Sequence, residues 1–280
     1  MASLPSFRTR WLPVLLAVLA GQAWADDRFG CEQPIRVGFN DNPVFQLEGQ
    51  GIDPDLLAEL GRRTGCRFET HVMRSGQIWP AIQQRTIDLT TSAMLSHQRR
   101  AQVYFVSYLF LRNKLIVPLS LGVNLHSLEG FRNRPGLRLG IVQGRLQGPY
   151  LDGMLQLFRG DGRLLEFHDD HAAFAALLDG QIDGLLGHEL GLLHTIDAPL
   201  LRRRLRVVDV IPGPAAPRAL AFSRQRFTAA QSAEWQRLIE EMLLDGSLAR
   251  IMLRNAPLDV AAGLLDSGYR YGSTEQGWAQ

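Results

Sequence analysis

Short apolar runs alternate along the chain with longer segments in which apolar residues recur at helical spacing. Short, mostly apolar runs at 35–39, 87–89, 137–142, 205–210 and 219–223 predict strands, and the segment 67–71 after the first predicted helix is expected to be another. Helical spacing predicts helices over 54–64, 171–178, 189–196, 229–244 and 248–255. This alternation predicts an α/β protein in which helices pack on both faces of mainly parallel sheets.

The pattern of the first half returns in the second half. Arg36-Val37-Gly38 resembles Arg138-Leu139-Gly140, and in each half a short helix leads into a strand through an Ile-Asp pair, at 87–88 and at 182–183. Each half is therefore predicted to form its own strand–helix–strand–helix–strand unit, with a cleft between two lobes. The chain is expected to cross between the lobes near 116–118 and again near 219–221, and such a double crossing makes a hinge.

The first predicted helix has clear signals at both ends. Asp53 can cap its N-terminus, Pro54 fits its first position and Gly65 can end it, while Leu56 and Leu60 share one face. The glycine-rich tail after residue 257 follows no assignable pattern.

The N-terminus has the features of a secretory signal peptide. Arg8 and Arg10 precede an apolar run at 11–20, and Ala23-Trp24-Ala25 has the small residues of a cleavage site, so residues 1–25 are expected to be removed. An uncleaved membrane anchor is the alternative, but the run is too short to span a bilayer.

Export changes the interpretation of charge and cysteine content. Residues 1–25 carry two arginines and no acid, so the formal net charge of +2 becomes zero and gives no support for nucleic-acid binding. Cys31 and Cys66 lie in the exported part, before the first and second predicted strands, so an oxidising compartment predicts a disulfide between them. Cys31 does not directly follow the cleavage site, which argues against lipid attachment.

The segment 87–108 carries the main chemical signal. A short strand is expected to run into the Ser/Thr-rich turn Thr90-Thr91-Ser92, and the turn to open a helix with Arg99 in its first turn. Hydroxyls, backbone N–H groups and a guanidinium around one point suit a small anion, most naturally a carboxylate. The alternative is that Arg99 is an ordinary surface arginine.

Motifs along nearly the whole mature chain resemble the type 2 periplasmic solute-binding proteins of ABC importers, in the branch that binds polar amino acids. The motifs lie at 36–38, 51–56, 80–88, 96–99, 105–108, 182–183 and 245–249. The resemblance implies a two-lobed periplasmic-binding-protein-like II fold. Lobe 1 would comprise 26–117 and 222–280, and lobe 2 would comprise 118–221.

The resemblance also implies site residues. Arg99 corresponds to the arginine that pairs with the ligand carboxylate, and Ser92 falls where the family offers backbone and hydroxyl contacts. Gly144 lies in the loop whose N–H groups bind the same carboxylate from lobe 2. Met94 occupies a position that is usually Ser or Thr, and Phe45, after the first strand, is either a cleft residue or core.

Several positions depart from the family pattern. Arg145 and Leu146 replace small hydroxyl residues after Gly144, and Ser75 stands where an aromatic ring usually stacks on the ligand. His188 occupies the position of the aspartate that receives the ligand ammonium, although Glu189 is adjacent. These departures suggest a small carboxylate, with extra negative charge for Arg145, rather than a standard amino acid.

Other candidates have plainer interpretations. The run 168–171 (His-Asp-Asp-His), with His188 and His194, suggests a metal site, but such runs are more often helix caps and surface groups, and no metal is predicted. Tyr108 and Phe110 are candidates for the cleft, with Phe110 expected in the core. The segment 140–144 lacks the third glycine and the lysine of nucleotide-binding loops, and no cofactor is expected.

The predicted function is a non-enzymatic, monomeric periplasmic binding protein that hands a small carboxylate-bearing ligand to an inner-membrane ABC permease. One alternative is an enzyme on the same scaffold, like the family's cyclohexadienyl (prephenate) dehydratases, with Glu189 or His188 as the acid. Another is a module that presents ligand to a sensory receptor.

Overall fold

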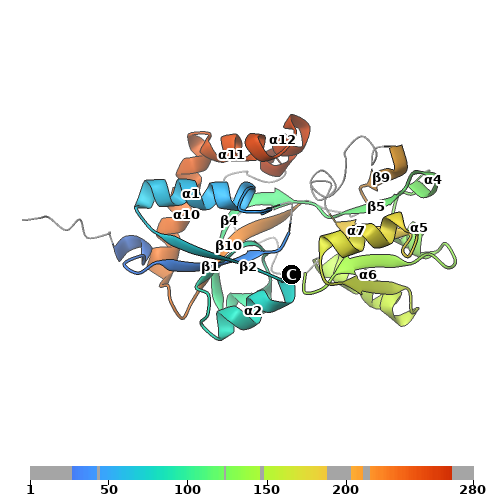
Figure 1. Cartoon of the computed structure of the whole chain (residues 1–280), viewed down its shortest axis with the longest axis horizontal. Coiled ribbons are helices and arrows are strands. Elements are labelled where there is room, and N and C mark those ends of the chain that lie inside the picture. The colour runs from blue at the N-terminus through green and yellow to red at the C-terminus, as the bar shows by residue number, and fades with distance from the viewer. Residues whose placement is uncertain are drawn as a thin grey trace, which may run out of the picture.

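A computed structural model of the chain describes residues 27–42, 45–122, 124–145, 148–187, 203–210 and 215–266. Within these ranges the strands form two five-stranded sheets, one in each lobe (Figure 1). The predicted α/β fold is therefore confirmed.

The first sheet has the strand order β2-β1-β3-β10-β4. Its strands are β1 (Ile35–Asn40), β2 (Phe68–Met73), β3 (Leu89–Met94), β4 (Val103–Leu111) and β10 (Ala216–Ser223). β1 runs parallel to β2 and β3, whereas β10 runs antiparallel to β3 and β4. The strand that returns from the second half is thus inserted into the middle of the first sheet.

The second sheet has the order β7-β6-β8-β5-β9. Its strands are β5 (Lys114–Pro118), β6 (Leu139–Val142), β7 (Leu164–Phe167), β8 (Gly184–Gly187) and β9 (Leu205–Val208). β6 is parallel to β7 and β8, and β5 pairs antiparallel with β8 and β9. A parallel three-stranded unit extended by antiparallel strands is therefore common to both sheets.

The chain passes between the sheets twice, from β4 to β5 and from β9 to β10. The crossings expected near 116–118 and 219–221 fall instead inside β5 and β10. The apolar pattern continues from each crossing into the following strand, so periodicity alone does not mark where the chain changes sheets.

Helices cover both faces of each sheet (Figure 1). The elements beside the first sheet are the 3₁₀ helix η1 (Asp27–Phe29), α1 (Ile52–Thr64), α2 (Ser75–Gln83), α3 (His97–Arg100), α10 (Ala229–Leu244), α11 (Ser247–Asn255) and α12 (Leu258–Asp266). Those beside the second sheet are α4 (Leu119–Gly122), α5 (Leu128–Arg132), α6 (Pro149–Gly160) and α7 (Asp170–Leu178). None of the helices in the described ranges is both long and apolar enough to cross a membrane.

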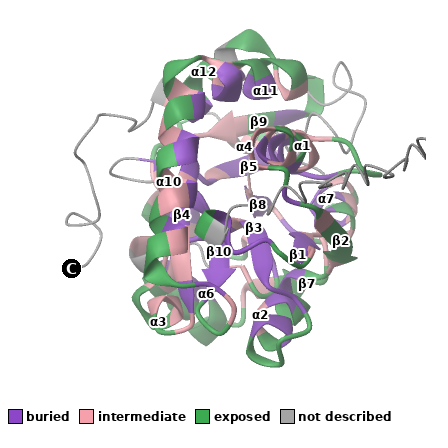
Figure 2. Cartoon of the chain, turned by 90° about the vertical axis from the view of Figure 1, so that its left-hand side faces the viewer, coloured by how far each residue is buried: buried purple, intermediate pink, exposed green. Residues whose placement is uncertain are grey.

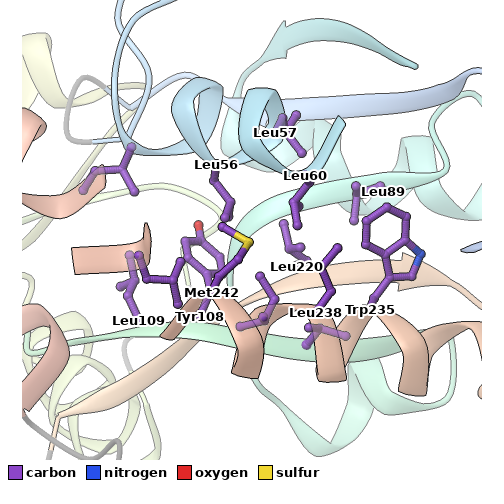
Figure 3. Close-up of a cluster of buried hydrophobic side chains, with 14 of the residues drawn as sticks. Leu56, Leu57, Leu60, Leu89, Tyr108, Leu109, Leu220, Trp235, Leu238 and Met242 are labelled. Carbon is purple, nitrogen blue, oxygen red and sulfur yellow. The ribbon is translucent and has the colours of Figure 1, made fainter. Parts of the chain in front are cut away.

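The largest core lies between the first sheet and helices α1, α10, α11 and α12 (Figure 3). Leu220 and Phe222 of β10 point into this core, while Ala221 between them joins the smaller core under α2. Trp235 is fully buried on the sheet-facing side of α10, whose other side is exposed (Figure 2). Burying each large apolar side chain contributes roughly 1.5–3 kcal/mol, so this packing fixes the first lobe.

The predicted disulfide is present between Cys31 and Cys66, whose Cα atoms lie 5.4 Å apart. Each cysteine precedes one of the two neighbouring parallel strands β1 and β2. The bridge therefore ties together the starts of two adjacent strands.

Candidate functional site

A hollow between the lobes is lined by both sheets. The carboxyl ends of β1, β3, β6 and β8 reach it, which is where open α/β sheets bind ligands. Its lining residues come from the first lobe (Asn40, Asn42, Phe45, Ser75, Ile78, Trp79, Thr90, Thr91, Ser92, Ala93, Met94, Arg99, Arg218), the connection Asn113 and the second lobe (Val142, Gly144, Arg145, Leu186, Gly187).

Arg99 lines this hollow, as the sequence predicted. Ser96 caps helix α3 by accepting a hydrogen bond from the Arg99 N–H (3.2 Å), and the Arg99 guanidinium lies 3.9 Å from the centre of the Trp79 ring. Burial lowers the pKa of Arg99 to about 10, with Asp152 acting in the opposite direction. Within the described ranges the guanidinium makes no hydrogen bond or ion pair, so it remains a charged donor for an anion.

The Ser/Thr run does not form the predicted turn. Thr90, Thr91 and Ser92 all lie in β3, and each hydroxyl donates to the protein interior. Thr90 donates to the carbonyl of Gly38, while Thr91 and Ser92 both donate to Asp53 at 2.5 Å. The run continues the central strand of the sheet, but the positive φ of Ser92 breaks the regular alternation of side chains between faces, so that Thr91 and Ser92 reach the same carboxylate.

Asp53 is the acceptor at the centre of this arrangement and does not cap α1 as predicted. It is 1% exposed and also accepts a hydrogen bond from Tyr108 (2.6 Å). The cap position belongs to Gly51, whose φ of 129° and contact with the Phe45 carbonyl leave no room for a side chain. At the other end of α1, Gly65 caps with φ 75°, as predicted.

The environment of Asp53 perturbs two pKa values. Burial raises the pKa of Asp53 to about 6, although the hydroxyls of Ser92, Thr91 and Tyr108 act to lower it. Burial and the nearby Asp53 raise the pKa of Tyr108 well above its usual value. Asp53 was missed as a site residue because its helix-start position has an ordinary explanation as a cap.

Both hydrogen-bond donors of Ser92 are used inside the protein, which the resemblance did not imply. Its N–H donates to the Tyr108 hydroxyl (3.0 Å) and its own hydroxyl donates to Asp53, so a ligand could only donate to the lone pairs of the Ser92 hydroxyl oxygen. Its φ of 54° is unusual for a residue other than glycine. Backbone strain of this kind concentrates at binding sites.

Gly144 lies where the second lobe touches the start of α2 in the first lobe. Its φ is 74°, and a Cβ atom here would lie 2.9 Å from the backbone nitrogen of Gly76 in α2. Glycine is therefore required both by the backbone conformation and by the contact between lobes.

Arg145 lines the hollow, but its charge is already matched. Its two terminal nitrogens donate to the two carboxylate oxygens of Asp170 at 2.7 and 2.6 Å. Its Nε also lies 3.4 Å from the Ser75 hydroxyl, which itself donates to Asn40. Arg145 was predicted to pair with a second acidic group of the ligand, but in the structure it pairs with a protein carboxylate, that of Asp170.

Residues 168–170 of the histidine–aspartate run form a helix cap and ion pairs. Asp169 caps α7 by accepting from the Ala172 N–H (2.8 Å), His168 pairs with Asp169, and Asp170 pairs with Arg145. No cluster of three or more potential metal ligands occurs among the described residues. His194 lies outside them.

The remaining candidates divide into three groups. Phe45 and Met94 line the hollow and are otherwise buried. Tyr108 lies behind the lining, and Phe110, half-buried in β4, is not part of it. The predicted residues outside the described ranges are His188, Glu189 and Leu146.

The site also contains an arginine that sequence reasoning missed. Arg218 in β10 is 5% exposed, and its Nη1 has no hydrogen-bond partner among the described residues. It pairs in register with Met94 of β3 and Leu109 of β4. The available signal was a single arginine inside the otherwise apolar run 215–222.

Comparison with known proteins agrees with this architecture. The sequence pattern of the bacterial extracellular solute-binding proteins, family 3, matches residues 35–255. No curated protein matches the sequence.

Similar solved structures include an ancestral arginine-binding protein bound to arginine, with 20% identity, a TM-score of 0.66 and coverage of 80% of this chain and 98% of that one. A mutant of the arginine-binding protein ArgBP from T. maritima has 18% identity and a TM-score of 0.64, covering 81% of this chain and 97% of its own. An ancestral amino acid-binding protein, a precursor of cyclohexadienyl dehydratase, has 19% identity and a TM-score of 0.65, covering 79% and 94%. At these identities the likeness concerns the fold.

Proposed function

Because the chain belongs to the bacterial extracellular solute-binding proteins of family 3, we propose that it captures a small carboxylate-bearing ligand between its lobes for import by an ABC permease. The observation that carries this proposal is the charged Arg99, stacked on Trp79 and facing the hollow with no ion pair to a protein carboxylate among the described residues. A planar guanidinium binds a carboxylate through two parallel hydrogen bonds.

The second lobe supplies the other side of the clamp. Gly144 touches the start of α2 across the hollow, and its backbone conformation leaves the loop close to where a ligand on Arg99 would lie. We propose that Gly144 contributes backbone contacts to the same carboxylate. Ser92 contributes through its free acceptor capacity, and Phe45 and Met94 provide apolar walls.

The binding role is tested by calorimetry of the purified mature protein against a panel of small mono- and dicarboxylates and the standard amino acids. At least one carboxylate should bind, and Arg99→Ala should lower its affinity by at least about 100-fold, because two charge-assisted hydrogen bonds are lost. Arg100→Ala is the matched control, since Arg100 follows in the same helix and does not line the hollow. Unchanged affinity in Arg99→Ala would refute the clamp.

The transport role is tested in cells. Deletion of the gene should abolish uptake of the radiolabelled ligand, and Arg99→Ala should fail to restore it. We also propose that the protein is monomeric and that it reaches the periplasm through a cleaved signal peptide. The mature form recovered from the periplasm should therefore begin at Asp26. Uptake that is unaffected by the deletion would favour a sensory partner.

A dehydratase-like enzyme is the second candidate, because one similar structure is described as a precursor of cyclohexadienyl dehydratase. Such chemistry needs an acid that reaches the substrate. The described lining contains three arginines and no Asp or Glu, since Asp53 is sealed behind Ser92 and Asp170 is paired with Arg145. Binding without turnover of a prephenate-like acid is therefore the expected result, and measurable turnover would reverse the order of the two functions.

A further inference from the structure

Arg218 is a buried cation on the strand that carries the chain back into the first lobe. Its side chain is 5% exposed, reaches the hollow, and leaves Nη1 without a hydrogen-bond partner among the described residues. Burying a charge without a partner is costly, so such a group is normally paired or neutralised.

Arg218 nevertheless remains a cation at neutral pH. Burial lowers its pKa to about 10, and the positive charges of Arg145 and Arg99 act in the same direction, while Tyr108 acts to raise it. All three arginines line the same hollow, so their positive charges surround one space. Within the described lining no carboxylate balances them.

The three arginines differ in what already pairs with them. Arg145 is held by both oxygens of Asp170. The guanidinium of Arg99 stacks on the Trp79 ring and feels the charge of Asp152, but it makes no hydrogen bond or ion pair in the described ranges, and neither does that of Arg218. The protein therefore presents to the hollow two cations without an ion pair and one cation that is paired with Asp170.

We propose that the ligand is a small dianion, with one carboxylate on Arg99 and a second carboxylate on Arg218. This inference rests on the proposed binding function and specifies its ligand class. Arg218 is thus a specificity-determining residue, because only a ligand with a second negative charge offsets the cost of its burial. A cationic ligand such as arginine is excluded by the same charges.

The test compares each diacid with its own monoamide, which has nearly the same size and shape but one charge less. Calorimetry at neutral pH would use malonate, succinate, glutarate and adipate together with malonamate, succinamate, glutaramate and adipamate. At least one diacid should bind about 100-fold more tightly than its monoamide, because leaving a buried charge unpaired costs a complex a factor of this order. The best chain length would report the span between the two guanidiniums.

Two variants assign the preference to Arg218. Arg218→Met keeps an unbranched apolar stem in place of most of the side chain and removes its charge, so it should reduce the diacid-to-monoamide ratio to within about 3-fold of unity while leaving monoamide binding nearly unchanged. The melting temperature of the unliganded variant should not fall, because an unpaired buried charge has been removed. Arg224→Met is the control, since Arg224 stacks on Tyr104 away from the hollow and its loss should preserve the full ratio.

The outcomes separate this inference from the proposed function. Equal binding of diacids and monoamides, or a ratio unchanged in Arg218→Met, would overturn the dianion and leave the Arg99 clamp standing. Failure of all diacids beside clear binding of another carboxylate would also overturn it. Absence of any carboxylate binding would contradict the proposed function itself. If Arg218→Met does not fold, the comparison of diacids with monoamides in the unmodified protein still decides.

Discussion

The units β1–β3 and β6–β8 join their first and third strands through the same pattern of hydrogen bonds. In the first, the Arg36 N–H donates to Asp88, and in the second the Arg138 N–H donates to Asp183. The Asp88 N–H donates back to the Arg36 carbonyl, and the Asp183 N–H to that of Arg138. The Ile-Asp pair that repeats in the sequence therefore fixes the start of each third strand against the first.

The glycines of the repeat have the same explanation. A side chain at Gly38 would overlap the Cδ1 of Ile87, and a side chain at Gly140 would overlap the Cδ1 of Ile182. In each unit the isoleucine of the Ile-Asp pair occupies the space that the strand glycine leaves open. The packing between the strand glycine and the isoleucine is thus the same in both units.

The ends of the strands that face the hollow are different. The first unit ends in hydroxyls gathered on the buried Asp53, with Arg99 beyond them. The second ends in Gly144 and the ion pair between Arg145 and Asp170. Framework positions are constrained by packing that both units share, whereas at the hollow each unit presents a different set of polar groups.

The largest expected difference between the units concerns their aspartates. Burial alone would raise the pKa of Asp88, but hydrogen bonds from Arg36 outweigh it and hold the pKa below its usual value. The Asp88 side chain is 5% exposed and makes two hydrogen bonds to the Arg36 guanidinium, while Asp183 is 31% exposed and lies 3.7 Å from Nε of Arg138.

Asp88→Ala should therefore lower the free energy of unfolding by about 3 kcal/mol, toward the lower end for a broken buried pair because Arg36 is partly solvated. Asp183→Ala should lower it by about 1 kcal/mol. Urea denaturation followed by circular dichroism measures both, and equal losses would show that the two units depend equally on this contact.

A second test concerns Asp53, which has no counterpart in the second unit, where Tyr150 occupies the same place in the first helix. The folded protein holds the Asp53 proton more tightly than the unfolded chain, because its pKa is raised from 3.8 to about 6. Asp53 therefore favours folding at low pH, and this contribution is lost as the pH rises from about 4 to about 6.

The difference in free energy of unfolding between the wild type and Asp53→Asn should decline over that window by about 3 kcal/mol and then level off. Urea titrations at a series of pH values give this difference directly. Thr91→Val, which removes one hydroxyl donor to Asp53, should extend the decline to higher pH. A difference that is constant with pH would contradict the buried, perturbed carboxyl.

The smallest expected effect tests the shared glycine–isoleucine packing. Gly140→Ala should cost about 1–2 kcal/mol, because the added methyl group would lie 2.3 Å from the flexible Cδ1 end of Ile182 and 3.2 Å from the Phe167 ring. In Gly140→Ala/Ile182→Val that end is absent, so the double variant should be more stable than the sum of the single losses predicts. Strict additivity, measured by thermal denaturation, would place the cause elsewhere.

Local pattern alone predicted a large part of the framework. The strand–helix–strand–helix–strand order of each unit, the disulfide between Cys31 and Cys66 and the repeat of the two units follow from periodicity, cysteine placement and recurring residues, while the helix predicted over 189–196 lies outside the described residues. The family membership that the motifs suggested is confirmed. Arg99 was identifiable because its signal, a cation at a helix start after a polar strand end, is contained in a dozen consecutive residues.

Tertiary structure alone decided which polar groups meet. Asp53 lies 38 residues before Thr91, Arg145 lies 25 residues before Asp170, and Arg218 reaches the hollow only because β10 is inserted between β3 and β4. Sequence periodicity reports which face of an element is buried, but the pairing of charges depends on where distant strand ends converge. The sequence by itself therefore determined the kind of protein and led to the proposal of Arg99 as an anion contact, while the fold determined that Arg145 is paired with Asp170 and that Arg218 has no such partner in the described ranges.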